Sequence, residues 1–282
     1  MGQEGLAVTA KLTAAGRAVE SRRADRLFED PLAAALAGEE GFDLMEQWRL
    51  PGMSEDQATM TIGPRTRFYD DLVVTAIGDG IVQVVLVAAG MDTRAFRLPL
   101  PEEVIVFELD LPELLEHKQA ILEREHAESR CHRKVVPVDL AEDDWPRALY
   151  AAGFDRSAPA VFIAEGLSWY LTEDENARLL DKLGSLAAPG SRLGFDIVSR
   201  DFLEDPAAVP FFEFTAARGI RWQFGTNEPA MFLAGHGWRA KVNAFAAVAR
   251  RLGRWPLPGI PEDVATKGGS YFIDSERAAP AA

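Results

Sequence analysis

Cysteine is almost absent from this 282-residue chain, which contains Cys131 alone, and histidine occurs only four times. One cysteine cannot form a disulfide framework, which supports many small secreted proteins. Scarce cysteine and histidine leave no set with the spacing of a zinc site, so we expect no metal. Cys131 lies in a polar run, and we interpret it as an incidental thiol rather than a nucleophile.

Long apolar runs are also missing. None approaches the roughly 20 residues that a helix needs to cross a bilayer. The first residues, Met-Gly-Gln-Glu-Gly-Leu, lack the basic segment and apolar run of a signal peptide. We therefore expect a cytoplasmic protein without a membrane partner.

Positive charge is in deficit, with 30 Lys and Arg against 44 Asp and Glu, a net charge of −14. Such a surface repels the phosphates of DNA and RNA, so we expect no nucleic-acid partner. Apolar residues make up 48% of the chain, which is ordinary for a globular protein. A small molecule is the expected partner, and the sequence does not determine the oligomeric state.

Short apolar runs alternate with helical patterns through the middle of the chain. This order is typical of an α/β protein, with a parallel sheet and helices on both faces. The predicted strands are 82–88, 104–109, 134–138, 159–164, 191–198, 239–243 and 270–273. The predicted helices are 9–24, 32–37, 65–77, 112–126, 144–152 and 173–187.

We expect one domain over residues 1–282, in three parts. Residues 1–78 form an N-terminal helical cover, 79–198 the cofactor-binding core, and 199–282 a substrate cover with the last strands. The segment 38–63 combines glycines and methionines with Trp48, which predicts an irregular lid that excludes water from the site. A plain surface loop is the alternative.

The turn after the first strand carries the strongest functional signal. An apolar run ends in Ala88, Ala89 and Gly90, small residues that let a ligand lie against the backbone. Asp110 ends the next strand 20 residues after Gly90, where an acid can reach a ribose diol. The turn lacks Gly-x-Gly-x-x-Gly, and Asp92 would repel a pyrophosphate. A nucleoside cofactor without phosphates fits better, and S-adenosylmethionine is the common one.

Two further acids follow the third and fourth strands, and the carboxyl ends of parallel strands meet in one crevice. We expect Asp139 to accept a hydrogen bond from the adenine amino group while Leu140 packs against the ring. Glu165 would face the methionine ammonium group or a sugar hydroxyl. Each acid alone could instead cap a helix, but Asp110, Asp139 and Glu165 all lie at one edge of the sheet.

Five motifs occur in order between about residues 17 and 187. They are ADRLFEDPLA at 24–33, RTRFYDD at 65–71, VVLVAAGMDTRAFRL at 84–98 with FELDLP at 107–112 and Lys118, Asp139-Leu140 with Trp145, and AEGLSWYL at 164–171. Together they resemble the leucine carboxyl methyltransferase-like class I methyltransferases, especially the bacterial, largely actinobacterial, O-methyltransferases. The resemblance implies a Rossmann-like sheet with an N-terminal helical lid and a cover inserted late in the chain.

The resemblance also implies roles for single residues, with S-adenosylmethionine as the cofactor and S-adenosylhomocysteine as its product. Arg65 holds the cofactor carboxylate, Gly90 lies under the methionine portion, and Glu165 closes the site. Arg67, two positions further along the same predicted helix, is the alternative to Arg65. The full set of expected cofactor-binding residues is Arg65, Ala88, Gly90, Asp110, Leu111, Asp139, Leu140, Glu165 and Gly166.

The expected reaction is O-methylation of a small molecule, with a carboxylate as first choice and a hydroxyl as second. A carboxylate is already ionised, so positioning can supply roughly 7–11 kcal/mol of the barrier reduction, whereas a phenol or alcohol needs a base. The substrate-cavity candidates are Trp169, Tyr170 and His236, with no certain catalytic residue. The aromatic run from Phe202 to Phe232 favours a large apolar acceptor, such as a polyketide-like acid, or else packs the cover onto the sheet.

Two other functions are compatible with this pattern. An NAD-dependent oxidoreductase shares the strand-end acid, but it requires a Gly-x-Gly-x-x-Gly turn and a proton-relaying residue. A protein that binds S-adenosylmethionine without methylating, or that is catalytically silent, would keep the same site, because fold and function separate easily. The sequence does not identify the methyl acceptor or the pathway.

Overall fold

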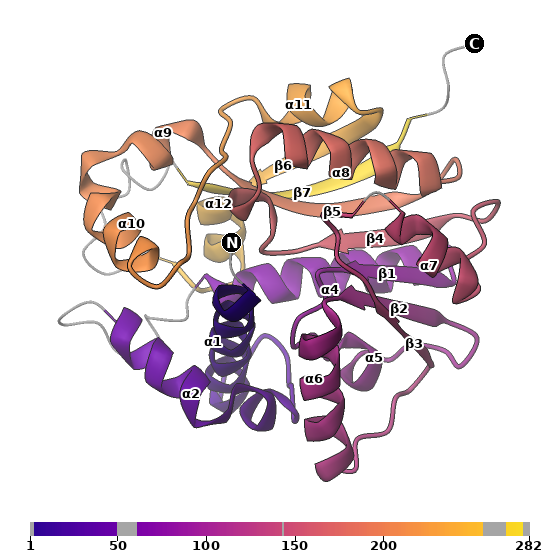
Figure 1. Cartoon of the computed structure of the whole chain (residues 1–282), viewed down its shortest axis with the longest axis horizontal. Coiled ribbons are helices and arrows are strands. Elements are labelled where there is room, and N and C mark those ends of the chain that lie inside the picture. Colours follow the sequence, from indigo (N-terminus) through magenta and orange to yellow (C-terminus); the bar gives the residue numbers. More distant parts are fainter. Residues whose placement is uncertain (1–2, 50–60, 143, 256–268, 279–282) are drawn as a thin grey trace.

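The structure is a computed structural model that describes residues 3–49, 61–142, 144–255 and 269–278. A seven-stranded sheet crosses its centre, with helices on both faces (Figure 1). Its strands are β1 (Gln83–Val87), β2 (Ile105–Asp110), β3 (His132–Pro137), β4 (Ala160–Ala164), β5 (Arg192–Val198), β6 (Trp238–Ala244) and β7 (Ser270–Arg277). The order across the sheet is β3-β2-β1-β4-β5-β7-β6.

The strand order reverses between β1 and β4. From β1 to β5 all neighbouring strands are parallel, whereas β7 runs antiparallel to both β5 and β6. The chain leaves β1 toward β2 and β3 on one side and returns to β4 on the other, which opens a crevice at the carboxyl ends. The turn after β1 therefore lies between the ends of β2 and β4.

Helices cover the two faces because the central strands are apolar on both sides. Every residue of β1 and of β4 is buried, as expected for strands in the middle of a parallel sheet. One face carries α4 (Ile62–Gly78), α5 (Arg94–Arg97), α6 (Pro112–Arg124) and α12 (Phe245–Arg251). The other face carries α7 (Trp145–Ala151), α8 (Glu173–Leu186) and α11 (Pro229–Gly235).

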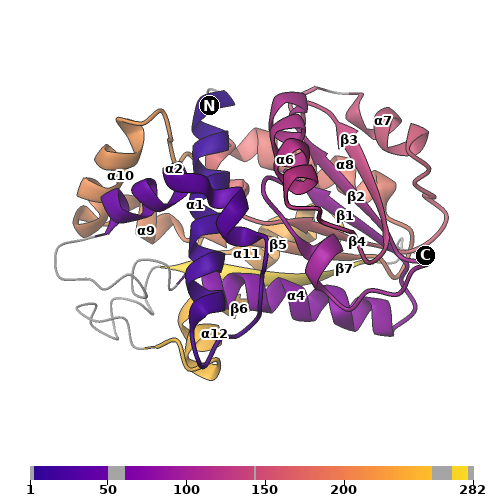
Figure 2. The ribbon, with the colours of Figure 1, turned by 90° about the horizontal axis from the view of Figure 1, so that it is seen from below.

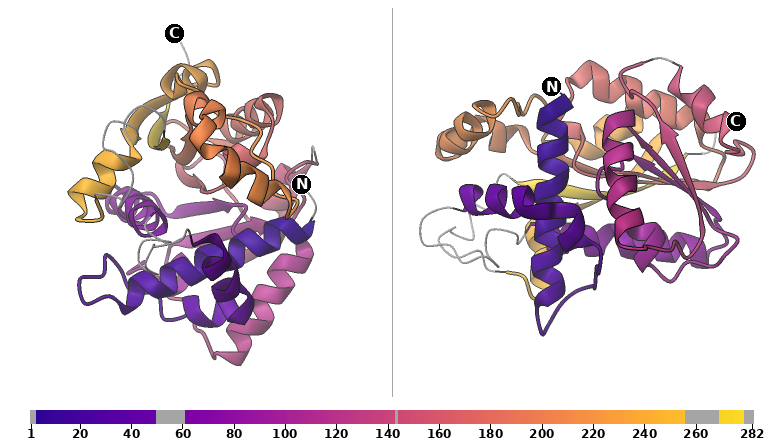
Figure 3. Two further views of the ribbon diagram at one scale, coloured as in Figure 1. Left: turned by 90° about the vertical axis from the view of Figure 1, so that its left-hand side faces the viewer. Right: turned by 60° about the horizontal axis from the view of Figure 1, so that its bottom comes forward.

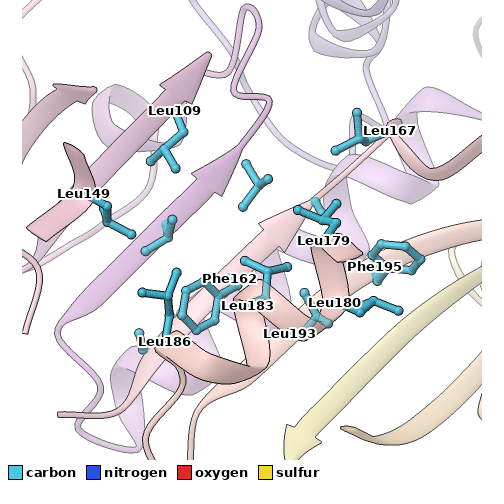
Figure 4. Packing of buried hydrophobic residues seen from close by; sticks show 14 of the residues in the cluster. Leu109, Leu149, Phe162, Leu167, Leu179, Leu180, Leu183, Leu186, Leu193 and Phe195 are labelled. Carbon is cyan, nitrogen blue, oxygen red and sulfur yellow. The ribbon is translucent and has the colours of Figure 1, made fainter. Parts of the chain in front are cut away.

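Helix α8 shows how local sequence and packing agree. Thr172 accepts a hydrogen bond from the Glu175 N–H while the Glu175 carboxylate accepts one from the Thr172 N–H, a capping box that begins the helix. The buried leucines of α8 face Phe162 and Phe195 of the sheet (Figure 4). They are Leu179, Leu180, Leu183 and Leu186.

An N-terminal cover consists of α1 (Gln3–Arg22) and α2 (Ala33–Trp48), which lie side by side (Figure 2). Small residues allow the close approach, since a Cβ on Gly41 would lie 2.6 Å from the Lys11 carbonyl oxygen. The prediction of irregular structure after residue 37 is wrong for residues 39–48. These residues continue α2 beyond a kink at Gly38, where φ is +58°. Residues 50–60 of the expected lid lie outside the described residues.

A second cover follows β5. It contains α9 (Arg200–Glu204), the 3-10 turn η2 (Pro206–Ala208) and α10 (Val209–Ala216), where the sequence predicts only an aromatic stretch. Trp48 of α2 makes edge contacts with Phe211 and Phe214 of α10, at centroid distances of 5.9 and 5.7 Å. These rings join the two covers, and Figure 3 shows α10 near the end of α2.

The buried pair of Glu108 on β2 and Lys118 on α6 yields a stability prediction. Both side chains are fully buried, with Nζ 2.8 Å from Oε2, and Arg133 also binds Glu108. Replacing Glu108 with Ala leaves the Lys118 charge buried without its partner, so we expect a loss of about 3–5 kcal/mol in unfolding free energy. Urea denaturation measures this loss.

The double variant Glu108→Ala/Lys118→Met should recover the part of the loss that comes from Lys118, because it removes that buried charge, while Arg133 still lacks its carboxylate. Glu123→Ala, on the exposed side of the same helix, is the control and should change stability by no more than about 0.5 kcal/mol. Equal stability of the single and double variants would contradict the account.

Candidate active site

A cavity of about 510 Å³ opens at the carboxyl ends of β1, β2 and β4. Thr9, Ala10 and Thr13 of α1 line it from the N-terminal cover, and Gln223 lines it from the second cover. All nine expected cofactor-binding residues and both aromatic candidates from the 3-10 turn η1 (Ser168–Tyr170) line this cavity. They are Arg65, Ala88, Gly90, Asp110, Leu111, Asp139, Leu140, Glu165, Gly166, Trp169 and Tyr170.

The turn after β1 is held in an unusual backbone conformation. Gly90 has a φ of +47°, and Ala88, which carries a Cβ, has a φ of +57°. A non-glycine residue in this region costs roughly 1–2 kcal/mol, and such strain gathers at functional sites. A Cβ on Gly90 would lie 3.3 Å from the Cβ of Ala10, so α1 lies directly over the turn.

Asp110 closes the other side of this turn. Its Oδ2 accepts the Gly90 N–H at 2.7 Å and its Oδ1 accepts the Leu111 N–H at 2.8 Å. Burial raises the pKa of the Asp110 carboxyl, and the two backbone N–H groups oppose that rise. These bonds fix the plane of the carboxylate and leave further lone pairs for a bound diol.

Arg94, which the sequence reasoning did not single out, is the centre of the charged part of the site. Its Nε donates to Asp70 Oδ1 at 2.9 Å and its Nη2 to Glu165 Oε2 at 2.7 Å, while Nη1 pairs with Asp92. Burial works to raise the pKa of Glu165, but Arg94 and Arg65 outweigh it and hold that pKa below its ordinary value. Arg94 likewise lowers the pKa of Asp92 against the effect of burial.

The structure distinguishes Arg65 from Arg67. Arg65 lines the cavity and donates through Nε to Glu165 Oε1 at 2.9 Å. Arg67 faces the surface, where it pairs with Asp71 at 2.8 Å and donates to the Leu27 carbonyl. Of these two arginines, Arg65 is the one that lines the cavity.

Further buried ion pairs connect the charged residues around Arg94 with α1. Arg17 of α1 donates to Asp30 at 2.8 Å and to the Met91 carbonyl at 2.5 Å. Asp70 of α4 pairs with both Arg94 and Arg97 of α5. The N-terminal cover is thus tied to the turn after β1 by buried charges.

After β3, Asp139 Oδ1 accepts the N–H of Ala141 at 2.9 Å, so this carboxylate orders its own turn. In the 3-10 turn η1, Trp169 stacks on Trp222 with ring centroids 4.9 Å apart and planes at 7°. Gln223, the residue after Trp222, also binds this turn, since its backbone N–H donates to the Trp169 carbonyl at 2.6 Å.

His236 is not part of this cavity. Its Nδ1 lies 2.8 Å from Asp181 Oδ1, and its ring packs against Phe232 at the end of α11. The structure therefore does not bring His236 into the cavity with the other two candidates, Trp169 and Tyr170.

No group of three or more His, Cys, Asp or Glu side chains among the described residues is arranged to hold a metal ion. Among the helices described, none is long and apolar enough to cross a bilayer.

Comparisons with known proteins agree with this geometry. A family model described as leucine carboxyl methyltransferase matches residues 10–184. A protein of Streptomyces coelicolor, provisionally named an S-adenosyl-L-methionine-dependent methyltransferase, is 40% identical over 94% of both chains. A Mycobacterium tuberculosis protein with the same provisional name is 36% identical over 91% of this chain and 90% of its own.

The fold recurs in solved structures. A crystal structure of a DUF574 family protein from Streptomyces avermitilis superposes with a TM-score of 0.61, at 17% identity, over 95% of this chain and 97% of the other. The crystal structure of a provisionally assigned methyltransferase from Thermobifida fusca gives 0.53, at 19% identity, over 96% and 94%.

The sheet thus has the Rossmann-like fold of class I methyltransferases. The chain belongs to the leucine carboxyl methyltransferase family, and its cofactor is S-adenosylmethionine. Membership of this family contradicts the alternative prediction that the protein is an NAD-dependent oxidoreductase.

The residues present fit that cofactor. The cavity offers the cation of Arg65, the oriented carboxylate of Asp110 and a glycine turn without phosphate-binding spacing.

Arg94 should control how stability depends on pH. Because the folded pKa values of Glu165 and Asp92 are lowered, their contribution is present above the ordinary values of 4.5 and 3.8 and is lost as the pH falls through the lowered ones. Arg94→Gln leaves these buried acids underpaired, so we expect a loss of about 3–5 kcal/mol at pH 7. The loss should shrink toward pH 4 because the acids can then be protonated.

Urea unfolding at pH 7 and pH 4 measures both quantities. Arg67→Gln is the matched control, since its ion pair is exposed, and its effect should stay within about 0.5 kcal/mol. An equal loss for Arg94→Gln at both pH values would show that the carboxylates do not depend on Arg94.

Proposed function

We propose that this methyltransferase transfers the methyl group to the oxygen of a carboxylate on a small molecule. The observation that carries the proposal concerns the titratable groups of the cavity. Asp92 and Glu165 are held ionised by arginines, and burial raises the pKa of the Tyr170 phenol. Among the described lining residues, no histidine is placed to act as a base. An acceptor carboxylate is already ionised and needs none.

In this proposal the cofactor-binding residues contact the methionine, ribose and adenine parts of the cofactor in turn. Arg65 holds the methionine carboxylate, Asp110 accepts both ribose hydroxyls, and Asp139 with Leu140 receives the adenine. The backbone lies close to the cofactor at four lining residues, Ala88, Gly90, Leu111 and Gly166. Glu165 holds the Arg65 side chain in the orientation that binds the cofactor carboxylate. The cofactor supplies an electrophilic methyl group on its sulfonium sulfur.

The chain's own contribution to the reaction is positioning and exclusion of water. In-line displacement requires the acceptor oxygen opposite the sulfur, and held reactants can gain roughly 7–11 kcal/mol. Helix α1 covers the turn after β1, and Thr9 of α1 lines the same cavity as Tyr170. The N-terminal cover therefore helps to enclose the acceptor end.

The acceptor end favours a large, partly aromatic acid. Trp169 and Tyr170 line the cavity there, and Trp222 stacks behind Trp169. Phe202, Phe211 and Phe212 surround Trp222 in turn. A polyketide-like or other secondary-metabolite acid matches this environment, and the proposal includes the cytoplasmic location that the single cysteine suggests.

Asp110→Ala tests the placement of the cofactor. Removing the carboxylate deletes the acceptor of the ribose hydroxyls and of the Gly90 N–H, so we expect calorimetric titration with S-adenosylhomocysteine to show at least about 100-fold weaker binding. Asp181→Asn, outside the cavity, is the control and should bind as the unchanged chain does. Unchanged affinity of Asp110→Ala would refute the site.

Methyl-labelled cofactor tests the acceptor. Incubation with panels of carboxylic acids, phenols and amines should place label in esters, which mild base hydrolyses to methanol. Label recovered only in base-stable ethers or amines would refute the carboxylate. Binding of S-adenosylhomocysteine without turnover of any panel member would favour the catalytically silent alternative.

A further inference from the structure

Asp196 of β5 lies directly behind the proposed cofactor-binding residues and has no role in the function described so far. Its side chain is fully buried. Its Oδ1 accepts the Gly166 N–H at 2.8 Å, which fixes the backbone of the segment that follows β4. Oδ2 has no hydrogen-bond partner among the described residues, and Arg65 Nη1 lies 3.8 Å from it.

Arg65 is therefore held between two carboxylates. Glu165 binds its Nε on the cavity side, at 2.9 Å, and Asp196 approaches its Nη1 from the interior. Gly166 lies against the Arg65 guanidinium, since a Cβ there would be at a contact distance of 3.6 Å, and its φ of +71° favours glycine at this position.

The groups that face Asp196 come from three elements. Arg65 and Tyr69 come from α4, Glu165 follows β4, and Tyr170 lies in η1. On β7, the residue paired with Asp196 is the apolar Phe272. Burial raises the pKa of the Asp196 carboxyl to about 7, Arg65 opposes that rise and Glu165 adds to it.

We propose that Asp196 is a positioning residue that takes up a proton from solvent on Oδ2 when a cofactor carboxylate binds Arg65. The inference rests on the proposed role of Arg65. Without ligand, the Arg65 guanidinium faces both Glu165 and Asp196. Glu165 also binds Arg94, whereas the cation that approaches Asp196 is Arg65. A third carboxylate at the same guanidinium would leave excess negative charge in a buried place, and protonation of Asp196 removes it.

The sign of the pH dependence follows. If ligand binding raises the pKa of a group, binding takes up protons and weakens as the pH rises. A rise of one unit from about 7 corresponds to about half a proton taken up at pH 7.5. The same rise in the Asp196 pKa weakens binding of the ligand roughly sevenfold between pH 6 and pH 8.5.

Calorimetric titration of the full chain with S-adenosylhomocysteine measures this directly. At pH 7.5 the binding enthalpy should differ between phosphate and Tris buffers by an amount that gives net proton uptake. Asp196→Asn keeps an oxygen for the Gly166 N–H but carries no titrating group. This variant should bind with no buffer dependence, and its affinity should stay near that of the unchanged chain at pH 6.

Asp181→Asn is the matched control, because its acid lies outside the cavity, and it should retain the proton uptake. Buffer-independent binding by the unchanged chain would overturn the inference while leaving the proposed cofactor site standing, and this result does not depend on any variant folding. The same uptake in Asp196→Asn would also overturn it. Absence of binding at every pH would overturn both proposals.

Discussion

A continuous chain of buried ion pairs holds the site together. It runs from Arg17 on α1 through Asp30, Arg97 and Asp70 to Arg94, and from there through Glu165 to Arg65. Neighbouring members belong to different elements, so the chain connects the N-terminal cover, α4, α5 and the end of β4. Burying so many charges is favourable only when each has its partner, and the cluster therefore specifies one arrangement of these elements.

The two covers depend on this cluster and on aromatic contacts. Arg17 donates to the carbonyl of Met91, which places α1 across the turn that carries Gly90. The second cover reaches the first through Trp48, Phe211 and Phe214. The covers thus meet over a sheet edge whose strand order reverses, and the cavity combines a polar, charged end with an aromatic end.

Much of the fold could be predicted from the sequence. The strands β1 to β5 and the helices α4, α6, α7 and α8 occur within two or three residues of their predicted bounds, because short apolar runs mark the strands and longer helical patterns mark the helices. The helices α5, α9, α10, α11 and α12 were missed because they are short, and their sequences show no clear period. The kink at Gly38 hid the second half of α2.

The sequence by itself determined the order of elements, the strand-end acids Asp110 and Asp139, and the family motifs, since these depend on neighbours along the chain. Only the tertiary structure decided which charges meet. Arg94 binds Glu165 across 71 positions and Arg65 binds it across 100, whereas Arg67 finds Asp71 four positions away. Arginine and carboxylate side chains pair with any opposite charge that folding brings near, so local patterns cannot assign their partners.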